Sequence, residues 1–496
     1  MKRTTLSLLA GTTALAAVTG FAVLSTPDAV GGDTTAAAAQ LPVERTSLLC
    51  PQPSTSDVAE TAYTSFTPVT KGTGSDGSAA LEAAGGTGTD GKTEKSKKAK
   101  KPVLELKEPG KPVTTSTDSG DSPALIGTAE GKFAPGWTVQ QTTEVAAGIG
   151  RGLLGVNCTA PDTEFWFPGV STSEGRTDYV HLTNPDDAAA VVDIELYGKD
   201  GALKSTVGEG ITVRPRSSEP VLLSTLATAK EADLTVRISV RSGRVAAAVQ
   251  ALDEKQGGDW LAASTDPTAD LVLPGIPKDA TDVRLIAFAP GDTDADLNVR
   301  LASPSGQITP AGNETLHVKA GMTAAADLGD VTRGEAGSLI LTPTDSSVPV
   351  VAALRIVRGK GADQETAFIP ATRPVGSRAT VADNRAKGTT LALTATGSAA
   401  KVKVTASAGS GGGTPTTKTF TIKAGTTQNV DMPAPNGLKG TYALTVERLS
   451  GGRLYASRTL ASTLDGVPAF TVQTLPDDRG TVAVPEAEQD LSVLQK

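Results

Sequence analysis

The feature that most constrains this chain is a passage that the sequence states twice. Residues 179–201 read YVHLTNPDDAAAVVDIELYGKDG, and residues 284–306 read RLIAFAPGDTDADLNVRLASPSG. With a shift of 105 residues and no gap, Pro185 falls on Pro290 and Leu196 falls on Leu301. In both passages every second residue of the central run is apolar, which is typical of a strand with one buried face. Self-similarity at a fixed spacing indicates tandem copies of one structural unit.

A third, fainter copy follows. Residues 391–409 read LALTATGSAAKVKVTASAG, which repeats the pattern of strand, turn and strand. The alternation predicts that Val402, Val404 and Ala406 point inward. Helical periodicity is scarce along the whole chain, so the pattern indicates an almost entirely β protein.

Each copy is expected to open on a strand that a proline closes. These prolines are Pro168 in FWFPGV, Pro274 in LVLPGI and Pro370 in AFIPAT, and we expect them to mark equivalent strand ends. Units of roughly 100 residues with short alternating strands are typical of β-sandwich domains. The expected fold class is therefore all-β, with tandem immunoglobulin-like β-sandwich domains.

The copies predict a domain organisation along the 496-residue chain. Three β-sandwich repeats are expected at 163–268, 269–372 and 373–485. A divergent N-terminal β unit is expected at 40–162, and a C-terminal tail at 486–496.

The N-terminus has the composition of an export segment. Lys2 and Arg3 precede an apolar run from Leu6 to Leu24, and the small-residue tract TTAAAAQ offers a cleavage point after Ala39. The apolar run is also long enough to span a bilayer. Residues 1–39 are therefore either a cleaved signal peptide or a retained membrane anchor. Both alternatives place the rest of the chain outside the cytoplasm, with membrane contact only through this segment if it stays uncleaved.

The chain has two cysteines, Cys50 and Cys158. In an oxidising compartment they are expected to form a disulfide, and the alternative is a pair of free buried thiols. The bridge would hold together the N-terminal β unit, which a segment at 71–123 interrupts. That segment is rich in Gly, Ser, Thr, Asp and Lys, so we expect it to be disordered.

Motifs that carry chemistry are scarce. The sequence contains no catalytic constellation and no cofactor fingerprint, so the chain is expected to be no enzyme and to need no cofactor. His181 and His317 are interpreted as solvent-facing strand residues. A weak candidate for a metal site is the trio Asp292, Asp294 and Asp296, but the calcium-loop pattern then requires Gly and Glu where this chain has Leu297 and Ser303. A solvated hairpin is the favoured interpretation.

One basic cluster lies inside the predicted insertion. It consists of Lys92, Lys95, Lys97, Lys98, Lys100 and Lys101. The cluster is either a solvating tether or a contact for an anionic cell-wall polymer, because clustered lysines attract phosphate-bearing chains. Nucleic acid is not an expected partner, since the net charge is −8 and aromatic residues make up only 3% of the chain.

Three passages carry a resemblance to a known group of proteins. They are LPVERTSLLCPQP at 41–53, NCTAPDTEFWFPG at 157–169, and VHLTNPDDAAAVVDIELYGKDG at 180–201. Together with the export segment they resemble a family of secreted or membrane-anchored proteins of unknown function from high-GC Gram-positive bacteria. The resemblance implies a protein that faces the cell envelope, and it supplies no catalytic residues.

These observations favour a non-enzymatic, exported cell-envelope protein. It would act as a scaffold, a spacer or a binding module, with an anionic cell-wall polymer or another surface protein as its partner. The alternative is a cell-wall hydrolase or an enzyme accessory whose carboxylate-based site is formed across domains, because paired carboxylates need no linear motif.

Overall fold

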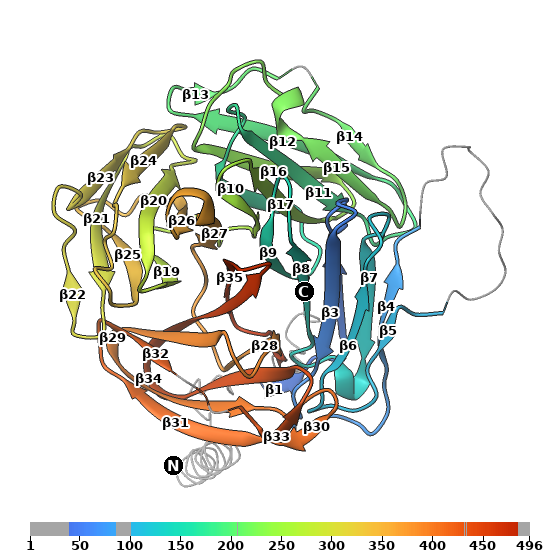
Figure 1. Ribbon diagram of the computed structural model, residues 1–496. Coiled ribbons are helices and arrows are strands. Elements are labelled where there is room, and N and C mark those ends of the chain that lie inside the picture. Colours follow the sequence, from blue (N-terminus) through green and yellow to red (C-terminus); the bar gives the residue numbers. More distant parts are fainter. Residues whose placement is uncertain (1–38, 86–100, 206, 431, 433, 485–496) are drawn as a thin grey trace, which may run out of the picture. The chain divides into compact units, whose positions relative to one another are not determined.

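The computed structural model describes residues 39–85, 101–205, 207–430, 432 and 434–484 (Figure 1). The contacts divide the chain into two compact units, of which Pro42–Val482 is the larger. The strands β1 (Ala39–Pro42) and β36 (Thr481–Val484) form a two-stranded sheet. The predicted export segment before Ala39, five of the six clustered lysines and the tail at 486–496 lie outside the described residues.

The larger unit confirms the all-β prediction of tandem β-sandwiches. Within the described ranges the helical elements are three short 3-10 turns, at Gly131–Phe133, Leu223–Thr225 and Gly361–Asp363. No helix in these ranges is long and apolar enough to cross a membrane. Each of four segments folds into paired antiparallel layers, which we call the first to the fourth sandwich.

The first sandwich has two four-stranded sheets. One sheet contains β2 (Arg45–Cys50), β7 (Leu125–Glu130), β4 (Ala79–Ala83) and β5 (Leu104–Glu105), in that order. The other contains β6 (Val113–Thr117), β3 (Ala59–Phe66), β8 (Thr138–Val145) and β9 (Gly152–Asn157).

The second sandwich repeats this plan. One sheet contains β10 (Glu164–Val170), β16 (Leu234–Ser242), β12 (Ala190–Gly198) and β13 (Gly201–Ala202), with β14 (Ile211–Val213) also paired to β12. The other contains β15 (Ser218–Leu222), β11 (Arg176–Thr183), β17 (Ala246–Asp253) and β18 (Gly257–Leu261).

The third sandwich matches the second strand for strand. One sheet contains β19 (Leu271–Ile276), β25 (Gly337–Pro343), β21 (Ala295–Ala302) and β22 (Gln307–Ile308), with β23 (Thr315–Val318) also paired to β21. The other contains β24 (Thr323–Asp327), β20 (Ala280–Phe288), β26 (Val351–Arg358) and β27 (Glu365–Pro370).

The fourth sandwich joins its layers through two long strands, visible in Figure 1. Its sheet contains β28 (Arg378–Asn384), β34 (Tyr442–Leu464), β29 (Thr389–Ala406), β31 (Thr416–Ile422), β32 (Thr426–Val430) and β35 (Val467–Thr474), beside a small sheet of β30 (Gly412–Thr414) and β33 (Asn436–Lys439). The first part of β29 pairs with β32 and the second part with β31. This single long strand therefore takes the place of two separate strands in the other sandwiches.

Alternating side chains form the core of each sandwich. In β12 the residues Ala190, Val192, Ile194 and Leu196 are buried, and those between them are partly exposed. In the third copy Val402, Val404 and Ala406 are buried, as the alternation predicted. Burial of one face of each layer is the main source of stability in such domains.

Two sequence predictions need correction. The segment at 71–123 is not disordered throughout, because β4, β5 and β6 lie within it, and its stretch 86–100 lies outside the described residues. The few apolar residues of the segment are well placed: Leu81, Leu104 and Leu106 are all buried in the core of the first sandwich. Low average hydrophobicity therefore concealed three strands.

The second correction concerns the prolines. Pro168 and Pro274 occupy equivalent places, each beside a register shift in the first strand of its sandwich. Pro370 instead ends β27, which is the last strand of the third sandwich and pairs with β26. The similar local sequence reflects a similar buried strand, whereas the pairing partners differ.

The predicted disulfide is confirmed. Cys50 ends β2 and Cys158 follows β9, so the Cys50–Cys158 bridge joins the two sheets of the first sandwich. It closes a loop whose ends are 108 residues apart, which contributes about 4–5 kcal/mol on the chain-entropy model.

Small apolar clusters join each sandwich to the next. The first and second meet at Leu49, Ala84, Ala124, Ile126 and Ala246; the second and third at Trp166, Tyr197, Phe288 and Val351; the third and fourth at Val272, Ala302, Ile340 and Tyr455. The fourth sandwich contacts the first through Ala382, Ala443 and Phe66. Through these apolar clusters each sandwich is packed against two others, and the fourth is packed against the first.

Phe288 is a test of how far the sandwiches stabilise one another. Its ring is 1% exposed and lies 4.6 Å from the Tyr197 ring and 5.5 Å from the Trp166 ring, centroid to centroid. We expect Phe288→Ala to lower the free energy of unfolding by about 3–5 kcal/mol, because it leaves a cavity between two domains. Urea unfolding measures the change. The control is Ile308→Ala, since Ile308 is 48% exposed. Equal, small effects of the two substitutions would contradict tight packing at this contact.

Candidate functional site: a buried polar junction between the sandwiches

The candidate site lies where the last strands of the four sandwiches meet. β9, β18 and β27 are edge strands of their sheets, and β35 pairs only with β34. Each contacts two of the others: β9 contacts β18 and β35, and β27 contacts the same two strands. An edge strand presents backbone N–H and C=O groups without ladder partners, so these four strands bring unpaired polar groups into one interior region.

Asp259 of β18 accepts hydrogen bonds from two other sandwiches. Its Oδ1 accepts from the backbone N–H of Gly155, at 3.0 Å, and both carboxyl oxygens accept from Oγ1 of Thr471, at 3.0 and 2.9 Å. Gln473 donates in turn to the Thr471 hydroxyl, at 2.6 Å. The Asp259 carboxyl is 0% exposed, and this burial raises its pKa well above the ordinary value.

Gly155 makes this close approach possible. A Cβ atom at this position would lie 2.7 Å from Cγ2 of Thr471, closer than packed carbon atoms come. The glycine thus lets the backbone of β9 reach the carboxyl of β18 beside β35. Three sandwiches are connected through one buried carboxyl group.

Glu365, the first residue of β27, is the second buried carboxyl group of the junction. Its side chain is 3% exposed and forms an ion pair with Arg151, which lies just before β9. Burial raises the pKa of Glu365 to about 7, against the opposing effect of the Arg151 guanidinium. The negative charge of Glu365 also disfavours ionisation of Asp259 and contributes to its raised pKa.

Arg151 connects the first three sandwiches. Its Nη2 donates to the carbonyl oxygens of Lys255, Ala362 and Gln364, at 3.2, 2.9 and 3.0 Å. Lys255 belongs to the second sandwich, and the other two residues to the third. Because a guanidinium presents several donors in a fixed plane, one side chain can bind all these acceptors together with the Glu365 carboxylate.

A further charged group is buried nearby, on β34. Arg458 is 0% exposed, and its guanidinium has no hydrogen-bond partner among the described residues. Burial lowers its pKa to about 10, and the charges of Asp383 and Asp259 act in the opposite direction. The guanidinium therefore remains charged at neutral pH and offsets part of the negative charge of the junction.

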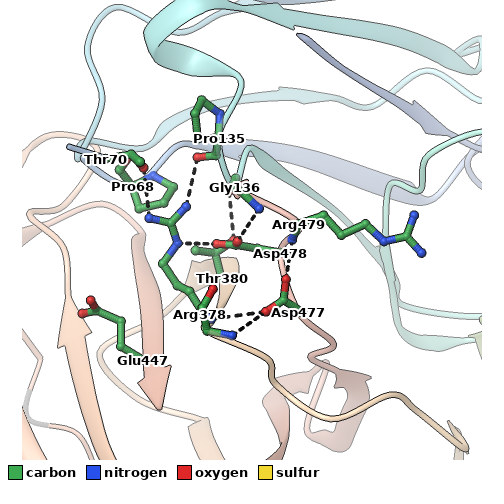
Figure 2. A network of polar contacts seen from close by, with 12 residues as sticks. Pro68, Thr70, Pro135, Gly136, Arg378, Thr380, Glu447, Asp477, Asp478 and Arg479 are labelled. Carbon is green, nitrogen blue, oxygen red and sulfur yellow. Dashed lines mark hydrogen bonds and ion pairs between the residues drawn. The ribbon is translucent and has the colours of Figure 1, made fainter. Parts of the chain in front are cut away.

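A second polar cluster, which we call the clasp, joins the fourth sandwich to the first. Figure 2 shows the Arg378 side chain reaching toward Thr70, Pro135 and Asp478. Nε donates to Asp478 Oδ2 at 2.5 Å, Nη1 to Thr70 Oγ1 at 3.0 Å, and Nη2 to the Pro135 carbonyl at 3.3 Å. Thr380 adds a hydrogen bond to the Gly136 carbonyl at 3.1 Å.

Asp478 is deeply buried within the clasp. Its side chain is 5% exposed and also accepts from the backbone N–H of Gly480, at 3.0 Å. Burial raises its pKa, and the Arg378 charge opposes this effect. Glu447, also drawn in Figure 2, pairs instead with Lys403 at 2.7 Å.

The chemistry open to these groups follows from their surroundings. Two carboxyls with raised pKa values can serve as acid and base where a substrate reaches them. Asp259 and Glu365 are instead covered by strands of neighbouring sandwiches, and both Asp259 oxygens and Oε1 of Glu365 bind protein donors. A surface hollow of about 480 Å³ is lined by Asp279, Asp330, Arg333 and Lys360 together with Ala280, Thr281 and Gly334, and neither buried carboxyl borders it. The junction geometry is that of an interdomain connection.

The structure brings two of the three predicted aspartates beside a histidine. His317 Nδ1 lies 2.8 Å from Asp296 Oδ1, and Nε2 lies 3.6 Å from Asp294 Oδ2. All three side chains are exposed, and Asp294 also accepts from the backbone N–H of Ala320. Across the described parts of the chain, no group of three or more His, Cys, Asp or Glu residues is placed to hold a metal ion. Asp292, Asp294 and Asp296 are therefore not assembled into such a site.

The prediction that His181 faces solvent is wrong. The residue is 4% exposed, and its ring packs at 5.1 Å against the ring of Trp260. Its cross-strand partner is Ala248, which belongs to an apolar cluster with Leu154 and Val156 of the first sandwich. A neighbouring domain therefore covers the face that would be wet in an isolated sandwich. This burial lowers the pKa of His181 to about 4.

The basic cluster cannot be placed, except for one residue. Lys101 is exposed, and Lys92, Lys95, Lys97, Lys98 and Lys100 lie outside the described residues.

Removing the cation of the clasp tests its contribution to stability. We expect Arg378→Met to lower the free energy of unfolding by about 3–5 kcal/mol, because Asp478 would stay buried without its counter-charge. Urea unfolding measures this loss, and adding Asp478→Asn should restore part of it. The control is Arg45→Met: the Arg45–Glu130 pair is 72% and 53% exposed, so its loss should cost below about 1 kcal/mol. A double variant no more stable than Arg378→Met would argue against the ion pair.

Comparison with known proteins gives a family but no activity. A search of curated proteins finds no match to this chain. A model of a family of unknown function, DUF5719, matches residues 113–433, which is more than half of the 496 residues. The match begins at β6 of the first sandwich, covers the second and third sandwiches and ends after β32 of the fourth. The chain therefore belongs to the family of unknown function DUF5719.

Proposed function

We propose that the protein is a non-enzymatic, exported component of the cell envelope that acts as a scaffold, spacer or binding module. The observation that carries this proposal is the use made of the buried charged groups. Asp259 and Glu365 bind donors from other sandwiches, and Arg378, whose charge is balanced by Asp478, donates to Thr70 and Pro135 of the first sandwich. These contacts stabilise a fixed arrangement of domains. Such a connected set of domains is suited to holding surface loops at set distances from one another.

The N-terminal sequence supports the location. Its charged start, apolar run and small-residue tract are typical of export, and the Cys50–Cys158 disulfide is the kind of bond that persists in oxidising compartments. The lysine cluster at 92–101 supports an anionic cell-wall polymer as the partner. Its charge contrasts with the net charge of −8 for the whole chain, so a local basic segment would direct the contact.

A second candidate function rests on one observation. Asp259 and Glu365 come from different sandwiches and both have raised pKa values, as the acid of a hydrolase would. This observation favours the alternative of a cell-wall hydrolase or an enzyme accessory. Burial of both carboxyls under neighbouring strands weighs against it, because a polymer substrate has to reach the acid.

Co-sedimentation with isolated cell walls tests the first proposal. We expect the protein to bind intact walls and to lose most of this binding after the anionic polymers are stripped, or at high salt. A variant with the six clustered lysines replaced by glutamine keeps the length of the segment and should bind at least tenfold more weakly. A matched control replaces Lys199, Lys204, Lys230, Lys255, Lys278 and Lys319, which lie outside the cluster. Equal binding by both variants would exclude the cluster as the contact.

The same preparation tests the alternative. Release of soluble wall fragments, abolished by Glu365→Gln or Asp259→Asn, would establish a hydrolase and overturn the non-enzymatic proposal. Absence of wall binding under every condition would leave a surface protein as the partner to be sought.

A further inference from the structure

The geometry of the junction makes its packing sensitive to the protonation of one carboxyl group, that of Glu365. The first residues of three edge strands, Gly152 of β9, Gly257 of β18 and Glu365 of β27, occupy equivalent positions at the start of their strands. A Cβ atom on Gly152 would lie 2.6 Å from Oε2 of Glu365, and one on Gly257 would lie 3.0 Å from it. The Glu365 carboxyl thus occupies space that two glycines of other sandwiches leave open.

Oε2 of Glu365 is the atom that makes this position sensitive. Oε1 is paired with Arg151, whereas Oε2 is buried and has no hydrogen-bond partner among the described residues. An ionised carboxylate with one unsatisfied buried oxygen is destabilised, and protonation removes that charge.

Charged and polar groups near the Glu365 carboxyl lie on, or next to, the strands that surround the junction. Arg151, before β9, forms the ion pair, and Asp259 of β18 contributes a second acid. The charge of Asp259 also acts on Arg458 of β34. Asp383, Arg385 and Tyr442 act on Arg458 in turn. Lys255 and Ala362 face Arg151 with their backbone carbonyls, and Thr471 of β35 faces Asp259 with its hydroxyl.

We propose that Asp259 and Glu365 form a proton-operated lock between the sandwiches. While the pair holds a proton, one negative charge is balanced by Arg151 and the edge strands pack closely. When both carboxyls are ionised, the junction contains two adjacent negative charges, and the first three sandwiches separate more readily at β9, β18 and β27.

The direction of the pH effect follows from the proton balance. The pKa of Glu365 is raised from the ordinary value of 4.5 to about 7 in the folded protein, so the folded state holds a proton that the opened state releases. Stability from this group is fully present below pH 4.5, decreases as the pH rises from 4.5 to 7, and is lost above that range. The raised pKa of Asp259 acts in the same direction, starting from 3.8.

Hydrogen–deuterium exchange of the full chain measures the opening. After correction for the intrinsic pH dependence of exchange, we expect the opening constant of β9, β18 and β27 to increase roughly tenfold or more between pH 5 and pH 8. Glu365→Gln keeps an acceptor for Arg151 and leaves Asp259 as the one titrating carboxyl of the pair, so its opening constant should increase severalfold less than that of the unmodified protein over the same range. Asp259→Asn serves as the second variant if Glu365→Gln folds poorly, and it should reduce the pH dependence in the same strands.

The matched control is Asp465→Asn, in the hairpin of the fourth sandwich that corresponds to the one before Glu365. Asp465 is exposed, and its backbone is in the left-handed region, which asparagine tolerates. This variant should keep the full pH dependence of the unmodified protein. The proposal is overturned if opening of the unmodified protein does not increase between pH 5 and pH 8, or if Glu365→Gln retains the whole increase. Neither result depends on wall binding, so the lock and the proposed function are tested separately.

Discussion

Burial of the four edge strands against one another is the constraint on which the rest of the structure depends. An unpaired strand edge exposes backbone donors and acceptors, which proteins usually cover or blunt. Here one edge satisfies another: the Gly155 N–H binds the Asp259 carboxyl, and the Gly258 N–H binds the Arg151 carbonyl. A buried carboxyl is therefore not an anomaly in this fold, because it supplies the acceptor that an edge strand lacks.

The sequence predicted the sandwiches because the signals of a strand are local. Alternation in β12 and β21, 105 residues apart, reports which side chains face a core without knowledge of the partner strand. Local similarity gave a wrong prediction where the position of a strand depends on its pairing partner. Pro370 resembles Pro168 in its sequence context but ends a different strand of the sandwich. The average composition of the segment at 71–123 also gave a wrong prediction of disorder. Leu81 and Leu104 are buried and hold β4 and β5 in the core, although the segment is polar overall.

The junction could not be predicted, because its members come from four sandwiches. Arg151, Asp259 and Glu365 are each more than 100 residues from the next, and no spacing rule connects them. The burial of His181 could not be predicted for the same reason. The sequence of its strand indicates one buried and one solvent-facing side, and it is the first sandwich that covers the second side. A weak signal did exist in the glycines beside the charged residues, at Gly150, Gly152, Gly257 and Gly258, since such pairs often mark a close approach of backbone to another group.

The composition of the junction also bears on how similar domains find their correct neighbours. Tandem copies with alike cores could pack in more than one order, and apolar contacts alone discriminate weakly between such orders. At the first position of the edge strand, the four sandwiches carry Gly152, Gly257, Glu365 and Val467. A second glutamate in place of Gly152 or Gly257 would place a Cβ atom within 3.0 Å of the Glu365 carboxyl and add a like charge. We interpret this unequal set of side chains as the feature that makes only one order of sandwiches compatible with a closed junction. Buried charge then contributes more to specificity than to stability, which accounts for acids in an interior that apolar residues could fill.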